Sequence, residues 1–206
     1  MLRRTFLKAG AALAASIALA PLRRVFAAPR PLARTILPIN RGWRFAPHPV
    51  KGFERPDFDD SAFERIVVPH TNKLAPWHGF DEHETLFVSS YRRRFRLPAG
   101  SRGKRVFVDF EGALTATTVW LNGEKLGEYR GGYTPFSFEL TPHLHWEGEN
   151  LLAVQVDSTE QEDIPPFGNI VDYLTFGGLY REVSLRVVDT SHLDGLFIQP
   201  VEALSA

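Results

Sequence analysis

Short segments in which hydrophobic and polar positions alternate make up most of the chain after residue 40. Residues 150–157, for example, place Leu152, Val154 and Val156 on one face of an extended segment, and a period of two is typical of a strand with a buried face. No segment after residue 40 has the longer period of an amphipathic helix. The pattern predicts strands at residues 42–45, 65–68, 86–97, 106–110, 115–121, 125–129, 136–140, 150–157, 179–188 and 196–199.

Turn-forming residues separate these segments. Asn122-Gly123 lies between two extended runs and predicts a type I′ hairpin, because both central residues of that turn need positive φ. Residues 57–63 are predicted to form a turn in which Asp and Ser side chains bond to local backbone amides. Thr141-Pro142 predicts one short helical turn with Thr141 as its N-cap. Nine or ten short strands separated by turns favour an all-β, two-sheet jelly roll.

The composition is that of a soluble globular protein and narrows the possible chemistry. The chain has 206 residues, of which 44% are hydrophobic and 23% charged, enough for one domain with a buried core. Basic and acidic residues number 24 each, which argues against binding to nucleic acid through bulk charge. Cysteine is absent, so disulfides, thiolate metal sites and cysteine nucleophiles are excluded. No phosphate-binding loop or dinucleotide fingerprint is present, and we expect no cofactor.

The first 27 residues have the order of an export signal. Arg3, Arg4 and Lys8 form a charged start, and residues 9–20 are an apolar run too short to span a bilayer. Small residues then allow cleavage after Ala27. The Arg3-Arg4 pair resembles the twin-arginine signal. We therefore expect a periplasmic or secreted protein with no stable membrane span, and an uncleaved N-terminal anchor is the alternative.

Several short motifs follow one another in a specific order between residues 40 and 190. The most specific are Val119-Trp-Leu-Asn-Gly123, Gly131-Gly-Tyr-Thr-Pro-Phe136 and Gly177-Gly-Leu-Tyr-Arg-Glu-Val183, and Tyr91-Arg-Arg-Arg-Phe95 precedes them. Together they resemble the N-terminal sugar-binding domain of glycoside hydrolase family 2, which includes β-galactosidases, β-glucuronidases and β-mannosidases. The resemblance implies a galactose-binding-like jelly-roll β-sandwich and a β-linked carbohydrate as its ligand.

The resemblance also implies an organisation along the chain. We expect an export signal at residues 1–27, an extended lead-in at 28–40, the jelly-roll domain at 41–190 and, at 191–206, the start of the immunoglobulin-like domain that follows in this family. Members of the family carry an acid/base glutamate and a nucleophilic glutamate in a later (β/α)₈ barrel, the chemistry of a retaining glycosidase. We therefore expect no catalytic residue in this chain and no hydrolysis by the chain alone.

The family also suggests residues that contact sugar. In several members an acidic residue shortly before the Gly-Leu-Tyr-Arg motif reaches the sugar subsite, and Asp172, six residues before Gly178, matches that placement. A carboxylate can accept hydrogen bonds from two hydroxyls at once. Trp77, Tyr173 and Phe176 are the aromatic residues expected on loops, where their rings can stack on sugar faces or cap the end of the sandwich.

Other polar groups allow different chemistry. Asp109 and Glu111 could form a carboxylate pair, but residues two apart on a strand diverge, which favours a polar strand edge over a glycosidase pair. The acidic residues within 160–163 form either a solvated loop or a calcium or sugar site. The histidines and carboxylates within 78–83 lack the helical spacing of a metal site, and we expect no metal there.

Three functions are consistent with these observations. The leading interpretation is a non-catalytic sugar-binding and support domain of a family 2 β-glycosidase. A stand-alone periplasmic carbohydrate-binding module is one alternative. A subunit that complements a separate catalytic barrel is the other.

Overall fold

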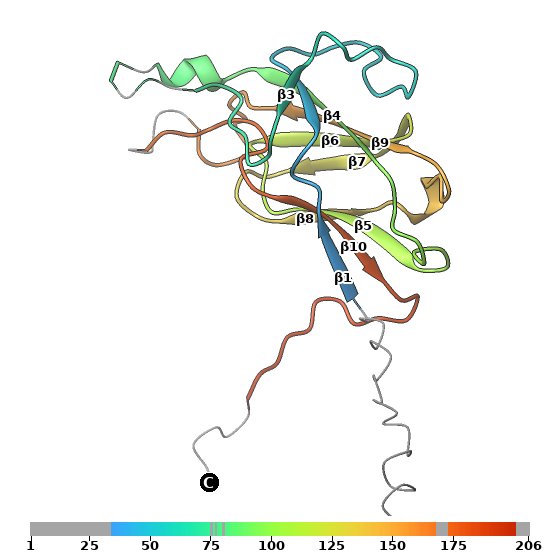
Figure 1. Cartoon of the computed structure of the whole chain (residues 1–206). Helices are drawn as coiled ribbons and strands as arrows, with labels where there is room; N and C mark the ends of the chain where they lie inside the picture. Colours follow the sequence, from blue (N-terminus) through green and yellow to red (C-terminus); the bar gives the residue numbers. More distant parts are fainter. Residues whose placement is uncertain (1–33, 75, 77, 80, 168–172, 201–206) are drawn as a thin grey trace, which may run out of the picture. The chain divides into compact units, whose positions relative to one another are not determined.

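Two antiparallel sheets contain all the strands in the part of the chain that the computed structural model describes, residues 34–74, 76, 78–79, 81–167 and 173–200 (Figure 1). The four-stranded sheet has the order β1-β10-β5-β8, and the six-stranded sheet has the order β3-β2-β4-β9-β6-β7. This arrangement confirms the predicted all-β sandwich. The strands are β1 Arg34–Pro38, β2 Trp43–Ala46, β3 Glu64–Ile66, β4 Val88–Phe95, β5 Arg105–Phe110, β6 Ala116–Leu121, β7 Glu124–Arg130, β8 Phe136–Glu139, β9 Asn150–Asp157 and β10 Val183–Val188.

Aromatic and branched side chains fill the space between the two sheets. Trp43, Tyr91, Phe110 and Leu121 are fully buried there. Strand β9 lies between β4 and β6, and its alternate residues enter this core as the pattern predicted. At about 25 cal/mol for each Å² of apolar surface removed from water, this burial is the main force that holds the sheets together.

Residues 47–63 cover the outer face of the six-stranded sheet. Phe53 and Phe63 from this segment form a second hydrophobic cluster with Ala46 of β2 and Ala153 of β9. Trp120 of β6 is half-buried beside the cluster, and its ring meets that of Phe53 edge-on, with centroids 5.4 Å apart. Strand β9 is therefore buried on both faces along most of its length.

Arg92 of β4 holds this covering segment in place. Its Nε donates to the Asp60 carboxylate at 2.8 Å, and its other nitrogens donate to the backbone carbonyls of Phe53, Arg55 and Phe58. The Arg92 side chain has no exposed surface. Burial lowers the pKa of the guanidinium, and the adjacent Asp60 carboxylate opposes that shift, so the charge is retained inside the fold because it is fully paired.

Two predicted turns are confirmed. Asn122 and Gly123 have φ values of +53° and +95° and join β6 to β7 as the type I′ hairpin requires. The Asn122 side chain adds a function that the motif does not show, because its Oδ1 accepts from the amide of Leu151 at 2.8 Å and so links the hairpin to β9. In the turn at residues 57–63, the Asp59 carboxylate accepts from the Ser61 amide at 2.9 Å.

The predicted N-cap of the short helical turn is wrong by one residue. The turn is a 3₁₀ helix, η2 Thr141–His143, whose N-cap is Leu140, and no side chain caps it. The Thr141 hydroxyl instead accepts from the amide of Val106 on β5 at 2.9 Å. This bond across to a neighbouring strand competes with the local cap, and the sequence around residue 141 does not show it.

The two ends of the described chain also differ from expectation. Part of the expected lead-in at 28–40 is strand β1, which pairs with β10 along Arg34–Pro38. Residues 196–199, predicted as a strand, pair with no described residue. Their side chains are exposed, with Phe197 at 83%, and an apolar run without a strand partner cannot form a ladder.

We predict that replacing Asp60 destabilises the fold. Asp60→Ala leaves the Arg92 charge buried without its carboxylate, and loss of one partner of a buried pair costs about 3 kcal/mol. Asp57→Ala is the matched control, because its ion pair with Arg55 is exposed and its loss should leave stability unchanged. Urea unfolding of the full chain measures both. Equal midpoints for the two variants would contradict the role of Arg92.

Candidate functional site

The candidate site lies at the end of the sandwich where β4 and β6 begin and β9 ends. Described parts of three connections meet here, residues 67–87, 131–135 and 158–182, and we call this region the loop end. The amide of Asn72 donates to the carbonyl of Gly177 at 2.9 Å. Connections more than a hundred residues apart are thereby bonded into one surface.

Two adjacent glycines allow this close approach. Gly178 has φ +96°, and a Cβ on it would collide with the Tyr91 hydroxyl. A Cβ on Gly177 would collide with the side chains of Asn72 and Ser158. The Gly178 amide donates to the Ser158 hydroxyl at 3.2 Å. The Gly-Gly pair therefore sets the path of the chain just before Tyr180.

Three tyrosines and one arginine gather at the rim of the loop end, and we call Tyr133, Tyr173, Tyr180 and Arg181 the tyrosine cluster. The Tyr180 hydroxyl donates to the carbonyl of Gly132 at 2.5 Å, and its ring meets that of Tyr133 edge-on, with centroids 6.3 Å apart. Arg181 donates to the carbonyl of Tyr133 at 3.1 Å and lies 5.3 Å from the Tyr180 ring centroid. These contacts join two motifs that lie 48 residues apart in the sequence.

The phenols of Tyr133 and Tyr180 are neutral at physiological pH. Burial raises the pKa of Tyr133 well above its usual value, and its hydrogen bond with Tyr173 raises that pKa further, while the Arg181 charge acts in the opposite direction. Burial also raises the pKa of Tyr180. A neutral phenol can both donate and accept a hydrogen bond, as a sugar hydroxyl can.

The rings at this end are accessible to a ligand. Tyr133, Tyr173 and Phe176 are exposed by 39%, 51% and 43%. Aromatic rings with polar tips present an apolar face and a hydrogen-bonding edge together. Sugars have the same two kinds of surface, so the rim can stack on one face of a ring and bind its hydroxyls.

Two of the four predicted site residues belong to the loop end among the described residues. Tyr173 and Phe176 lie on the 158–182 connection as exposed aromatics, and Tyr173 joins Tyr133 in the tyrosine cluster. Asp172 and Trp77 lie outside the described residues, so their contact with sugar stays a prediction.

Neither Tyr133 nor Tyr180 is among the site residues predicted from the sequence. Each tyrosine follows a glycine pair in one of the family motifs. Those glycines are the signal in the sequence that could have indicated the site, since they mark places of close backbone approach. Only the tertiary contact shows that the two rings share one rim.

Two of the carboxylates considered for other chemistry, Asp109 and Asp163, are engaged in ion pairs. Asp109 accepts from Arg186 at 2.7 and 3.0 Å and from the Ser137 hydroxyl at 2.6 Å. Asp163 accepts from Arg130 at 2.7 and 2.9 Å. The Asp109 bonds form a largely buried structural pair within the four-stranded sheet, where β5 lies between β10 and β8, and not a polar strand edge. The Asp163 bonds form a surface pair on a loop, as the solvated-loop interpretation describes.

The stretch considered for metal binding contains a 3₁₀ helix, η1 Glu82–Thr85. Asp81 is its N-cap, and the Asp81 carboxylate accepts from the amide of His83 at 2.9 Å. Among the described residues, no three His, Asp or Glu side chains are grouped so that they could hold a metal ion. In the same part of the chain, no helix has the length and hydrophobicity needed to cross a membrane.

The fold and the loop end define a jelly-roll sandwich with an aromatic rim at one end, and comparison with known proteins identifies its family. Residues 78–188 match the sequence profile described as glycosyl hydrolases family 2, sugar binding domain. The chain belongs to this family, as its motifs predicted.

Relatives in the family are much longer than this chain. A β-galactosidase of Thermoanaerobacter pseudethanolicus is 43% identical over 81% of the chain, which spans 22% of that protein. A β-glucuronidase of Formosa agariphila is 32% identical over 78% of the chain and 18% of that protein. A crystal structure of Bacteroides uniformis β-glucuronidase matches with a TM-score of 0.66 and 33% identity, over 76% of this chain and 18% of that one. The chain thus corresponds to the sugar-binding domain, about a fifth of each glycosidase.

We predict that the loop end depends on the absence of a side chain at residue 178. Gly178→Ala combines a positive φ with a collision at Tyr91, whereas Gly103→Ala has a positive φ and open space around its Cβ. The control should lose about 1 kcal/mol of unfolding free energy from φ alone, and Gly178→Ala should lose about twice that or more. Urea unfolding compares them, and equal losses would mean that the close approach has no energetic weight.

Proposed function

We propose that this chain recognises carbohydrate for an exported β-glycosidase of family 2 and that the catalytic carboxylates lie outside its 206 residues. The observation that carries the proposal is the aromatic rim of the loop end, built from two family motifs that meet only in the fold. The names of the relatives, β-galactosidase and β-glucuronidase, support a β-linked sugar as the ligand.

The tyrosine cluster supplies the recognition chemistry in this proposal. The Tyr173 ring, about half exposed, stacks on one face of a sugar ring, because C–H bonds pack favourably against an aromatic face. Asp172 directly precedes Tyr173, and its carboxylate would accept hydrogen bonds from two neighbouring hydroxyls. In the complete enzyme, this rim positions the substrate while the barrel performs the hydrolysis.

A second arrangement has support from relatives that are named as subunits. A Leuconostoc lactis protein named β-galactosidase large subunit is 31% identical over 82% of this chain. Its name indicates an enzyme made of more than one kind of subunit, so the domain could serve a barrel carried by a different chain. Co-purification of the chain from its native host with a protein that contains a glycosidase barrel would distinguish this arrangement from a single longer chain.

We predict that the full chain binds β-galactosides or β-glucuronides through Tyr173 and does not hydrolyse them. Tyr173→Ala should weaken binding about tenfold by removing one stacking face and one hydroxyl. Phe197→Ala is the matched control, because Phe197 is also an exposed aromatic residue and should leave binding unchanged. Calorimetric titration measures affinity, and nitrophenyl β-glycosides report hydrolysis. Binding that is equal in both variants would contradict the site, and steady hydrolysis by pure chain would contradict the absence of catalytic residues.

We further propose that the N-terminal segment directs twin-arginine export. Arg3→Lys with Arg4→Lys keeps the charge and removes the paired guanidinium groups, so the chain should stay in the cytoplasm. Arg23→Lys with Arg24→Lys is the matched control and should be exported. Cell fractionation with mass spectrometry of the N-terminus measures export and cleavage after Ala27. Unchanged export of the first variant would indicate the general secretory route.

A further inference from the structure

Two adjoining hollows lie beside the end of β4, far from the tyrosine cluster. One has a volume of about 460 Å³ and the other about 240 Å³, and Arg96 and Pro98 line both. We call the combined feature the arginine groove. Its lining includes Arg93, Arg94, Arg96, Arg102, Trp146 and Glu149.

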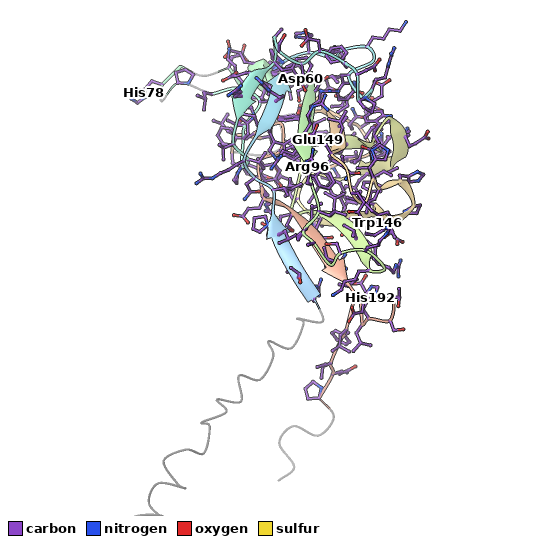
Figure 2. The ribbon with its side chains drawn as sticks, turned by 45° about the vertical axis from the view of Figure 1, so that its right-hand side comes forward. Asp60, His78, Arg96, Trp146, Glu149 and His192 are labelled. Atoms are coloured by element: carbon purple, nitrogen blue, oxygen red, sulfur yellow. The ribbon has the colours of Figure 1, made fainter. Side chains whose placement is uncertain are left out.

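The groove belongs to the opposite end of the sandwich from the loop end. Strand β4 runs from Val88 at the loop end to Phe95, which lines the groove and pairs with Asn150. Eight strand residues separate the two ends by about 25 Å. In Figure 2, Trp146 lies on the other side of the sandwich from His78, which belongs to the 67–87 connection of the loop end. A ligand in the groove would therefore occupy a site separate from the sugar subsite of the proposed function.

Two arginines of the groove are fixed in position. The Arg93 guanidinium donates to the carbonyl of Arg94. Arg94 donates to the carbonyl of Pro56 at 2.9 Å and contacts the Glu149 carboxylate at 3.4 Å. These bonds hold one wall of the groove in place, and the net charge of the groove remains positive.

Arg96 is the free cation of the groove. It is exposed, and among the described residues it makes no hydrogen bond or ion pair. Its planar guanidinium has five N–H donors and can bind a carboxylate or a sulfate through two of them at once. Arg102 adds a further positive charge, although the exposed Glu147 lies 3.5 Å from it. The groove therefore attracts anions through Arg96 first.

Trp146 gives the groove an aromatic surface. It is partly buried and packs against the main core, so its indole ring is held in place beside Arg96 and Arg102. Figure 2 shows Arg96 beside Glu149 in projection and Trp146 farther toward the lower right, and Arg96 lines one hollow with Glu149 and the other with Trp146. A fixed indole next to a free guanidinium can bind a ring and its negative charge together.

We propose that the arginine groove binds an anionic carbohydrate, with a sugar ring against Trp146 and its carboxylate or sulfate on Arg96. The indole favours a sugar over an acidic peptide, because a peptide carboxylate needs only the arginines. The groove is long enough for more than one sugar unit, since its two hollows continue past Arg96. Such a site would hold the chain on an acidic polysaccharide whatever bond the rest of the enzyme cleaves.

The test titrates the full chain with trigalacturonate, with its neutral methyl ester and with a sulfated galactan oligosaccharide. Trigalacturonate or the sulfated probe should bind at least about tenfold more tightly than the ester, and the preferred probe identifies the anionic group. Arg96→Gln should weaken that binding about tenfold, which corresponds to the loss of one charge-assisted contact. Arg65→Gln is the matched control, because Arg65 is also exposed but lies on the edge strand β3, and it should leave binding unchanged. Raising the salt concentration should weaken the binding of the charged probes and leave the binding of the neutral ester unchanged.

Several results would overturn the proposal. They are absence of binding by both charged probes, equal binding of trigalacturonate and its ester, or binding that Arg96→Gln leaves unchanged. A polyglutamate peptide that binds as tightly as the charged sugars would show general attraction of anions and would equally reject a carbohydrate site. Loss of binding in Tyr173→Ala but not in Arg96→Gln would assign the sugar to the loop end instead.

Discussion

The buried guanidinium of Arg92 is the interaction on which the six-stranded sheet depends. It holds residues 47–63 over the outer face of the sheet through the Asp60 carboxylate and three backbone carbonyls. Phe53 and Phe63 of that segment pack against the outer face of β9 and bury it. Strand β9, inside the sheet, is therefore protected from water on both faces along most of its length. The sheet can thus carry loops at one end and a groove at the other without losing its shape.

Neighbouring side chains of strand β4 have different roles, because successive residues of a strand point to opposite faces of the sheet. Tyr91 enters the core, lies 3.2 Å from His70 through its hydroxyl, and supports the backbone at Gly178. Arg92 points to the outer face. Arg93 reaches the open side of the sandwich, where it lines the groove. One motif of three arginines between two aromatic residues thus serves the core, the covering segment and a surface.

The candidate site depends on contacts between distant parts of the chain more than on any single residue. The carbonyl of Gly132 accepts a hydrogen bond from the Tyr180 hydroxyl, and the carbonyl of Tyr133 accepts one from Arg181. The two glycine-containing motifs therefore stabilise each other, and the rim exists only when both are in place. Much of their sequence serves to bring two backbones together.

Local patterns determined most of the strands, although not β1, together with the hairpin at Asn122-Gly123, the all-β class and, through its motifs, the family. These features depend on neighbours in sequence, because side-chain alternation and the positive φ of a two-residue turn are properties of a short segment. Tertiary structure alone decided the role of Arg92, the bond that draws Thr141 away from its cap, and the meeting of Tyr133 with Tyr180. Residues 196–199 show the same limit, since their apolar pattern needs a strand partner and the described chain supplies none. The type of each residue sets which bonds its side chain can make, and only the fold brings the partner of that bond within reach.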